Sequence, residues 1–377
     1  MKLSDREWKL FVVGELFSVK RPIARNKDNY ENGDIPFVAS GSANNGVMKC
    51  CKPHKNEGLD KAGCITVSPV DGSAFYQPCD FLGRGGAGSS ILMLYANNIN
   101  LYSGQFIAKM ISNTCACKYT YGHMGNKDSI KRERIMLPVD DNDEPDYQFM
   151  EDYMRELMAA KRKQYQKFIS KHLDKLGINI DNNALGGDKL NLYNKILEAN
   201  KIKFNDRAWK DICITSIFDS FVPGKGKGLN HLNQFQKDLS YIGATNRNNG
   251  VLCFVESDEI SCKMIQKGNC IGFIKNGDGS AGYAIYKRES FVSTSDVIYG
   301  YANWLNEYTG LFFVSAQDLI KGKYSHGYKR NQQHLRGDRV MLPVNDNNEP
   351  DYDFMEECGR KMMAKKYIQY LKYLEST

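Results

Sequence analysis

The sequence predicts an α+β protein made of two tandem copies of one β-rich domain, each followed by a long helix. Two observations predict this architecture. The eighteen residues RIMLPVDDNDEPDYQFME, which begin at Arg134, recur as RVMLPVNDNNEPDYDFME from Arg339 with fourteen positions unchanged. Other landmarks recur in the same order before each of these segments, so the repeat extends over most of the chain.

Each copy opens on a short motif that contains Trp, SDREWK at residues 4–9 and NDRAWK at residues 205–210. Further landmarks follow with only small changes in spacing, which indicates that insertions lie in loops. The matching pairs are PFVASGSANNGVM and SYIGATNRNNGVL, KAGCI and KGNCI, and YTYGHMGN and YSHGYKRN.

The segments between the landmarks are short and rich in β-branched and aromatic residues, with Gly and Asn between them. Examples are ITVSPV and SSILMLY in the first half and CIGFIK and DVIYGY in the second. This pattern is typical of strands joined by tight turns, so each half is predicted to be mainly β-structure.

A helix is predicted at the end of each half. DNDEPDY and DNNEPDY offer Asp or Asn as a cap, Pro for the first turn and acidic side chains at the positive end of the helix dipole. Apolar residues then recur at spacings of three and four. We expect the two helices to pair as an antiparallel coiled coil, which gives the chain pseudo-twofold symmetry. A helix of about 28 residues spans roughly 42 Å.

These signals divide the chain into five parts. The first β-rich domain covers residues 1–143, and its long helix covers 144–176. Residues 177–204 form a linker with a short helix. The second β-rich domain covers 205–348, and the second long helix covers 349–377.

Composition limits the classes of protein to consider. The 377 residues, of which 42% are hydrophobic, can form two folded domains. No apolar run could span a bilayer, and MKLSDREWKL does not resemble a signal peptide, so a cytoplasmic protein without membrane contact is expected. The eleven cysteines contain no CxxC pair and are expected to be reduced. A net charge of +7 permits contact with a polyanion.

No catalytic motif stands out. Two G-x-G-x-x-G matches, from Gly83 and Gly277, are followed by β-type sequence and are interpreted as turns. The chain has no phosphate-binding P-loop, no Pro-Pro-Tyr loop of a DNA methyltransferase and no paired histidines for a metal. We therefore expect a non-catalytic chain with no cofactor and no metal of its own. The alternatives are a stand-alone DNA methyltransferase or nuclease, or a protein-binding scaffold.

Basic, amide and aromatic side chains concentrate in the loops of both halves. Arg, Lys and Asn contact phosphates and base edges, so double-stranded DNA is the expected ligand. The framework of the two halves agrees while these loops differ, as expected for two domains with different target sequences. The candidate DNA-binding residues are Lys20, Arg21, Arg25, Lys27, Ser42, Asn44, Arg84, Tyr121, His123 and Lys127 in the first half, and Lys225, Lys227, Asn230, Asn246, Arg247, Asn248, Lys275, Tyr324, His326, Lys329 and Arg330 in the second.

As a set, these motifs resemble the DNA-specificity subunits of type I restriction-modification systems, or the similar specificity subunits of type IIB systems. The resemblance covers essentially the whole chain. It is carried by D-R-x-W-K, by the ASGSANNG and GATNRNNG turns, and by LPV with EPDY before each helix. DGSAGYAIY, STSDV and YSHGYKRN of the second half fit best. The first half departs in GRGGAGSS, which stands in place of STSD, and lacks KR after YGH.

The resemblance implies two target-recognition domains, each reading one half of a split, asymmetric DNA site. The two helices would set the spacing and dock DNA adenine methyltransferase subunits, or a fused methyltransferase-nuclease chain. A restriction or translocase subunit is a further implied partner. S-adenosylmethionine and Mg2+ would belong to those partner subunits and not to this chain.

Overall fold

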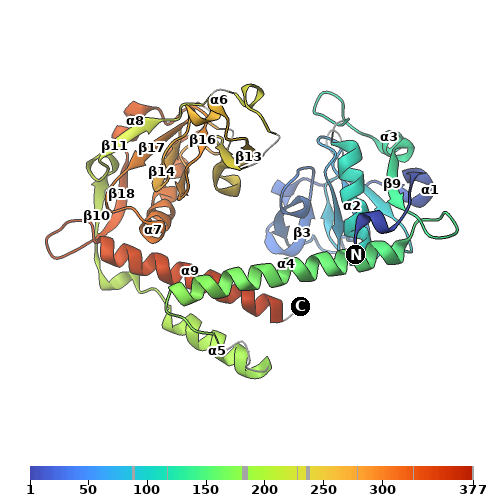
Figure 1. The fold of residues 1–377 in the computed structure, drawn as a ribbon, viewed down its shortest axis with the longest axis horizontal. Helices are drawn as coiled ribbons and strands as arrows, with labels where there is room; N and C mark the ends of the chain where they lie inside the picture. The colour runs from blue at the N-terminus through green and yellow to red at the C-terminus, as the bar shows by residue number, and fades with distance from the viewer. Residues whose placement is uncertain are drawn as a thin grey trace. The chain divides into compact units, whose positions relative to one another are not determined.

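The computed structural model describes residues 1–86, 90–116, 118–180, 186–226, 228–234, 238–277, 279–325 and 327–375 (Figure 1). Contacts divide the chain into two compact units, Met1–Gln166 and Lys167–Thr377, here called unit 1 and unit 2. The division falls inside the long helix α4 (Tyr147–Lys175).

Unit 1 contains three sheets. A two-stranded sheet pairs the first strand with the last, and the order of the four-stranded sheet is β2-β8-β5-β6 and that of the three-stranded sheet β4-β3-β7. The strands are β1 (Trp8–Val12), β2 (Ser18–Lys20), β3 (Asn32–Val38), β4 (Val47–Cys51), β5 (Cys64–Val67), β6 (Ala74–Gln77), β7 (Leu82–Gly83), β8 (Leu92–Tyr95) and β9 (Arg134–Pro138), and the helices before α4 are α1 (Val13–Leu16), α2 (Leu101–Cys115) and α3 (Lys127–Arg132).

Unit 2 repeats this topology strand for strand, with sheets β10-β18, β11-β17-β14-β15 and β13-β12-β16. The prediction of two copies of one β-rich fold is therefore confirmed. Its elements are α5 (Gly186–Ala199), β10 (Ala208–Cys213), β11 (Ser220–Pro223), β12 (Leu239–Ile242), β13 (Val251–Val255), α6 (Glu259–Cys262), β14 (Cys270–Ile274), β15 (Ala284–Lys287), β16 (Val292–Ser293), β17 (Val297–Tyr301), α7 (Glu307–Gln317), α8 (Gln332–Arg336), β18 (Arg339–Val344) and α9 (Tyr352–Glu375).

One helix packs on the four-stranded sheet of each unit, α2 in unit 1 and α7 in unit 2, and a glycine makes the close approach possible. A Cβ on Gly104 would lie 2.2 Å from the ring of Tyr76, and a Cβ on Gly310 would lie 2.3 Å from the ring of Tyr286. The core of each unit forms where this helix meets the sheet and the first turns of α4 or α9.

The most strongly repeated residues lie at the beginning and end of the β-rich part of each unit. Arg6 forms an ion pair with Asp146 at 2.8 Å, and in unit 2 Arg207 pairs with Asp351 at 2.9 Å. Asp146 also accepts a hydrogen bond from the backbone N–H of Phe149 at the start of α4. The repeated motifs therefore contact each other, which explains their repetition structurally. The predicted aspartate caps are confirmed, whereas the prolines lie just before the helices and not in their first turns.

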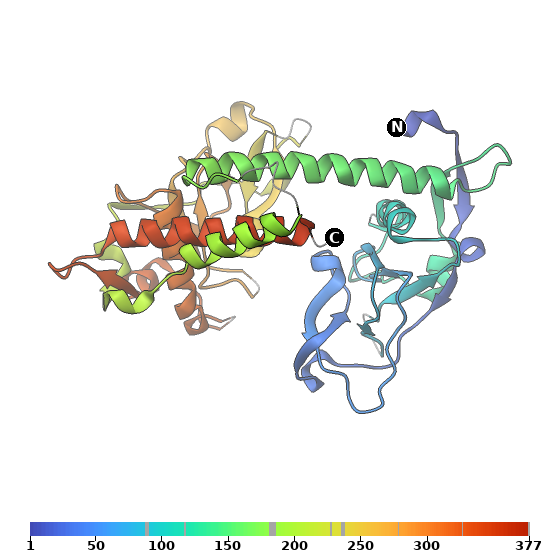
Figure 2. The ribbon, with the colours of Figure 1, turned by 90° about the horizontal axis from the view of Figure 1, so that it is seen from below.

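The two long helices are present, and a third helix joins them. Within unit 2, the end of α4 packs against the end of α9 through Ile169, Leu173, Ile368 and Leu371. These last turns run in opposite directions (Figures 1 and 2). The linker helix α5 adds Tyr193 to the same cluster, so α5 extends the pairing that the sequence predicts into a three-helix cluster.

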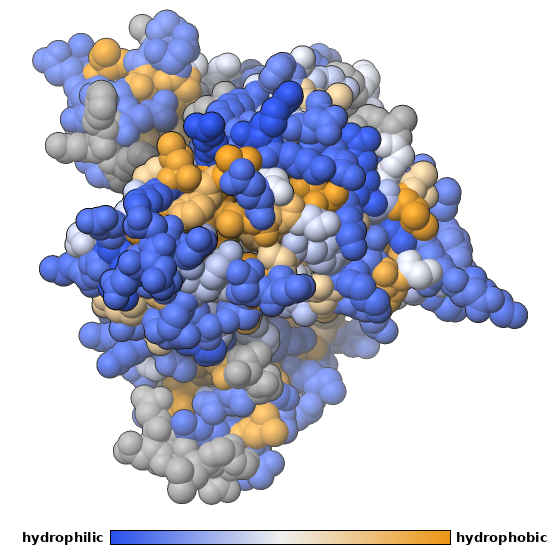
Figure 3. Space-filling model, turned by 90° about the vertical axis from the view of Figure 1, so that its right-hand side faces the viewer, coloured by the Kyte–Doolittle hydropathy of each residue, from blue (hydrophilic) through white to orange (hydrophobic). Residues whose placement is uncertain are grey.

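Hydrophilic side chains cover most of the face shown in Figure 3, and apolar side chains gather near its centre. Within the part of the chain that the structure describes, no helix is long and apolar enough to cross a membrane.

Cysteines are distributed over both units, and Cys64, Cys115 and Cys270 are buried in the cores, where burial raises the pKa of each thiol to about 12.

Candidate nucleic-acid interface

Two loops of unit 2 that carry candidate residues are joined by hydrogen bonds. The turn from residue 243 to 250 holds Asn246, whose side-chain oxygen accepts a hydrogen bond from the Ser280 hydroxyl at 3.0 Å. The loop between β14 and β15 also approaches the turn closely, because a Cβ on Gly277 would lie 2.1 Å from the carbonyl oxygen of Ala244. The two loops therefore form one surface.

A third segment, from residue 324 to 330, is attached to the same loop. The backbone N–H of Arg330 donates to the carbonyl oxygen of Lys275 at 3.0 Å, and its guanidinium Nη1 donates to that of Gly282 at 3.2 Å. This attachment brings Lys275 and the exposed Lys329 to neighbouring parts of the surface.

The fourth segment, residues 223–226, lies against the STSD sequence at residues 293–296. A Cβ on Gly224 or Gly226 would lie 1.9 or 1.8 Å from a carbonyl oxygen of Thr294 or Ser293, so only glycine allows this approach. The Thr294 N–H donates to Ile242 at the end of β12. The candidate residues of unit 2 did not include STSD. Its place among the motifs that carry the family resemblance is the sequence feature that could have indicated it.

Four separate sequence segments thus meet at one end of the sheets of unit 2. Lys225, Asn246, Arg247, Asn248 and Lys329 are exposed there, and Lys275 is half-buried. Asn230 is exposed on the turn Leu229–His231, and no hydrogen bond of the described residues joins that turn to the four segments. Lys227 and His326 lie outside the described residues.

Two candidate residues of this unit are buried and have a structural role. Arg330 is fully buried and forms an ion pair with Asp338 at 2.7 Å. The buried Tyr324 donates its hydroxyl hydrogen to the same carboxylate at 2.6 Å. Their polar groups are used inside the unit, which argues against direct contact with DNA and corrects the interpretation of both residues.

The buried network shifts the ionisation of its members. Burial lowers the pKa of the Arg330 guanidinium, and the neighbouring Asp338 carboxylate opposes this shift. Burial and the same carboxylate raise the pKa of Tyr324 well above its usual range. Through its hydrogen bonds to Lys275 and Gly282, Arg330 joins the β14–β15 loop to the segment that follows Tyr324.

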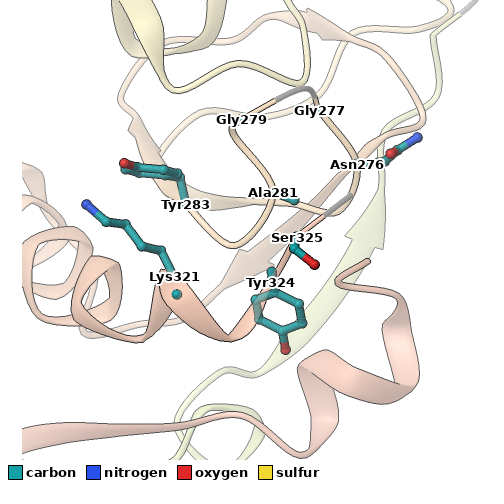
Figure 4. A pocket seen from close by; sticks show the side chains of 9 residues that line it. Asn276, Gly277, Gly279, Ala281, Tyr283, Lys321, Tyr324 and Ser325 are labelled. Atoms are coloured by element: carbon teal, nitrogen blue, oxygen red, sulfur yellow. The ribbon is translucent and has the colours of Figure 1, made fainter. Parts of the chain in front are cut away.

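A cavity of about 280 Å³ lies between this loop and that segment (Figure 4). Asn276, Gly277 and Gly279 line one side, and Tyr324 and Ser325 line the other. The ammonium group of Lys321 lies 4.6 Å from the ring centre of Tyr283 at its margin. Sequence reasoning gave no signal for Lys321 or Tyr283.

In unit 1, the basic segment after β2 lies against the glycines that follow β7. A Cβ on Gly85 would lie 2.1 Å from the Ile23 carbonyl oxygen, and Ala24 forms a β-bridge with Gly85. The Arg84 N–H donates to the carbonyl of Val38, just before the turn that carries Ser42 and Asn44. Lys20, the last residue of β2, and Arg21, the first residue of this segment, are exposed.

Lys27 and Arg84 come together at a cavity of unit 1. This cavity, about 290 Å³ in volume, is also lined by Phe37 and Met48. The exposed Ser42 lines another cavity of unit 1, about 570 Å³, together with Ser73 of the β5–β6 loop. The turn and the β5–β6 loop of unit 1 are therefore neighbours, as the corresponding loops of unit 2 are.

Arg25 is the third candidate that is buried. Its guanidinium pairs with Glu57 at 2.8 Å and with Asp60 at 2.6 Å. Burial raises the pKa of the Glu57 carboxyl, but hydrogen bonds from Arg25 and Tyr30 outweigh it, and the net pKa lies below its usual range. Arg25 is thus a structural residue of unit 1, which corrects its interpretation as a DNA contact.

The remaining candidates of unit 1 lie on the segment after α2. Tyr121 has 84% of its surface exposed, and His123 and Lys127 are also exposed. Gly125, which stands at the position of Arg330, donates its N–H to the carbonyl of Pro69 at 2.8 Å. The backbone hydrogen bond of this segment to the neighbouring loop is therefore the same in both units. In unit 2 the buried arginine side chain adds a second contact to that loop.

Comparisons with known proteins found similar sequences and similar solved structures. A family model described as "Type I restriction modification DNA specificity domain" matches residues 5–167. The specificity subunit S.BcgI of a type II restriction enzyme from Heyndrickxia coagulans is 25% identical over 366 residues, which cover 95% of each chain.

Solved structures with similarity to this chain include two S subunits. That of a type I restriction-modification system from M. genitalium has a TM-score of 0.43 at 15% identity, covering 100% of this chain and 94% of the other. The HsdS subunit from Thermoanaerobacter tengcongensis has a TM-score of 0.31 at 10% identity, covering 98% of this chain and 92% of the other.

The matched family domain corresponds to unit 1 with part of α4, and unit 2 repeats both its motifs and its strand order. The relative from Heyndrickxia coagulans aligns over both units. Specificity subunits of this kind are non-catalytic components of restriction-modification systems. Residues 5–167 of this chain therefore belong to the family of type I restriction-modification DNA specificity domains.

Proposed function

We propose that the chain reads a bipartite, asymmetric DNA site, with one half-site for each unit. The observation that carries this proposal is the combination of one shared framework with two different sets of loops. The strands agree in order and pairing, whereas the loops at residues 39–46 and 243–250 differ. Ser42 in unit 1 corresponds to Asn246 in unit 2, and Ala43 corresponds to Arg247. Such differences suit two domains that contact different bases.

The DNA contacts in this proposal come from the accessible candidates. They are Lys20, Arg21, Lys27, Ser42, Asn44, Arg84, Tyr121, His123 and Lys127 in unit 1, and Lys225, Asn230, Asn246, Arg247, Asn248, Lys275 and Lys329 in unit 2, with Lys227 and His326 as further candidates outside the described residues. Cationic members would neutralise phosphates, and the amides would contact base edges.

The long helices serve in this proposal as spacer and as docking surface. Helix α4 has 29 residues, and at about 1.5 Å per residue its length is roughly 43 Å, slightly more than one turn of DNA. Leu157 and Phe168 keep 39% and 45% of their surface exposed on this helix. Exposed apolar side chains of this size suit a protein partner.

The proposed partners are DNA adenine methyltransferase subunits, or a fused methyltransferase-nuclease chain, with a restriction or translocase subunit in a larger complex. S-adenosylmethionine and Mg2+ would be bound by those subunits, in the cytoplasm with the DNA. Among the described residues, no group of three or more His, Cys, Asp and Glu could hold a metal ion.

Methylation mapping tests the proposal most directly. The chain is expressed with its neighbouring methyltransferase gene, and modified bases are mapped by long-read sequencing. A two-part adenine-methylated motif with an undefined central gap, lost when this chain is omitted, is expected. A contiguous motif, or one that persists without the chain, would contradict the proposal.

Two further measurements distinguish the alternatives. A stand-alone methyltransferase or nuclease would modify or cleave DNA as the purified chain alone. A protein-binding scaffold would show no DNA affinity that falls steeply with salt, as phosphate contacts require. Exchange of residues 1–140 for those of another such domain should change one half of the recognised sequence only.

A further inference from the structure

Both units contain an Asn-Asn-Gly turn with an unusual and shared backbone. Asn44 and Asn45 have φ of 50° and 56°, and Asn248 and Asn249 have φ of 51° and 49°. Two consecutive left-handed residues with side chains are rare, and asparagine tolerates this conformation better than most residues. The glycine that follows in each turn also has positive φ.

The second asparagine of each turn is fixed by the neighbouring strand. Asn45 donates its side-chain N–H to the Tyr76 carbonyl at 3.1 Å, and Asn249 donates to the Tyr286 carbonyl at 2.9 Å. The last residue of that strand returns the contact, since Gln77 in unit 1 donates to the Asn45 carbonyl at 3.1 Å. The second asparagine therefore has a structural role in both units.

The first asparagine has no such role. Asn44 and Asn248 are exposed, and their side chains make no hydrogen bond to the residues that the structure describes. Glycine adopts the same backbone conformation at least as easily. The fold thus requires a residue that tolerates positive φ at these two positions. It does not require a side-chain amide there.

On the assumption that each unit reads one half-site, we propose that Asn44 and Asn248 make the same base contact, a paired hydrogen bond to the edge of an adenine. Each half-site then contains an A·T pair at the place where this turn meets the DNA. The residues just before the shared asparagine differ, Ala43 in unit 1 and Arg247 in unit 2, and account for differences between the half-sites.

The chemistry of the side chain selects adenine. A carboxamide has both a donor and an acceptor, which match N7 and the N6 amino group of adenine in the major groove. A phosphate offers acceptors alone and is contacted equally well by lysine, arginine or a hydroxyl. Guanine presents two acceptors at the same edge and pairs better with arginine.

The test uses the complex of the full chain with its methyltransferase, after the wild-type motif has been mapped. Asn44→Gly and Asn248→Gly remove the amide and keep the left-handed backbone. Each variant should lose discrimination at one A·T pair of its own half-site by about 5- to 150-fold, the range for a paired base contact. The other half-site should be read as before.

Asn56→Gly provides the matched control. Asn56 is also an exposed asparagine with positive φ, 65°, but it lies on another loop of unit 1. Its replacement should leave both half-sites unchanged. Binding to a duplex with 7-deazaadenine at the assigned position, which lacks the N7 acceptor, should be weakened for the wild type and not further weakened for the glycine variant.

The outcomes separate the two proposals. A wild-type complex without a bipartite motif would overturn the proposed function itself. A bipartite wild-type motif that is unchanged in both glycine variants would overturn only the shared contact. Loss of affinity that is uniform over all sequences, with no response to 7-deazaadenine, would show a phosphate contact and would also overturn it.

Discussion

Replacement of Arg330 by methionine removes the centre of the buried network in unit 2. Methionine is an unbranched, flexible apolar side chain that fills much of the space without a charge. The variant loses the Nε hydrogen bond to Asp338, at 2.8 Å, and the Nη1 hydrogen bonds to Gln317 and Gly282, at 3.1 and 3.2 Å. Asp338 keeps the hydrogen bond from Tyr324.

The size of the effect follows from the remaining contacts. Loss of one partner of a buried ion pair typically costs about 3–5 kcal/mol, because the other charge stays buried. Tyr324 and the half-exposed Lys323 still contact the Asp338 carboxylate, so the low end of this range applies. We expect the free energy of unfolding of unit 2 to fall by about 3 kcal/mol.

Urea unfolding followed by tryptophan fluorescence can measure this change in unit 2 alone. Unit 2 contains Trp209 and Trp304, and unit 1 contains Trp8, so a Trp8→Phe background removes the signal of unit 1. Arg288→Met is the matched control, because Arg288 is exposed and pairs with Glu289 at the surface. A change within about 0.5 kcal/mol is expected for this control.

The double variant Arg330→Met/Asp338→Leu decides whether the buried charge is the cause. Removal of the stranded carboxylate should restore at least about half of the lost free energy, as hydrophobic replacement of buried ion pairs commonly does. A single variant that costs less than about 1 kcal/mol, or a double variant that is less stable still, would refute the role assigned to Arg330.

Three further predictions concern other parts of the chain. Asn249→Ala should lower the stability of unit 2 by about 1–3 kcal/mol through a lost hydrogen bond and a strained backbone, whereas Asn249→Gly should lose about 1 kcal/mol; calorimetry measures both. Ile368→Ala should lower stability by about 2–5 kcal/mol, because Ile368 is fully buried in the three-helix cluster, whereas Leu157→Ala should change it by less than about 0.5 kcal/mol and should weaken partner binding in a pull-down. Because the pKa of Glu57 is lowered in the folded state, its contribution to stability is present above the unfolded pKa of about 4.3 and is lost as the pH falls through the folded value. Glu57→Gln should therefore make the thermal midpoint less dependent on pH on the acid side, and an unchanged acid profile would contradict this reasoning.

The repeated framework could be predicted from the sequence because its physics is local. Asp146 and Asp351 cap helices, and a cap is recognised from one residue type before an apolar pattern. The short strands were recognised from their β-branched and aromatic residues. The packing of α5 on α9 was not predicted, because a short apolar stripe does not identify its partner.

The sequence does not separate the exposed candidate residues from the buried ones. Residue type alone selects both exposed and buried cations, and it therefore placed Arg25 and Arg330 among the DNA contacts. Their burial depends on carboxylates distant in the sequence, such as Asp60, 35 positions from Arg25. The sequence does not distinguish Asn45 and Asn249 from the asparagines that precede them, since only the structure shows which side-chain amide of each turn is hydrogen-bonded to the strand.

The pairing of β1 with β9, and of β10 with β18, has a consequence for how such a chain can arise and change. The polypeptide enters and leaves the β-rich domain of each unit side by side, so a pair of neighbouring strands closes each domain. A domain whose first and last strands pair with each other can be duplicated in tandem, or replaced by a related domain, without breaking a strand pair elsewhere. Under the proposed function, exchange of one domain would change one half of the recognised DNA sequence and leave the other half unchanged.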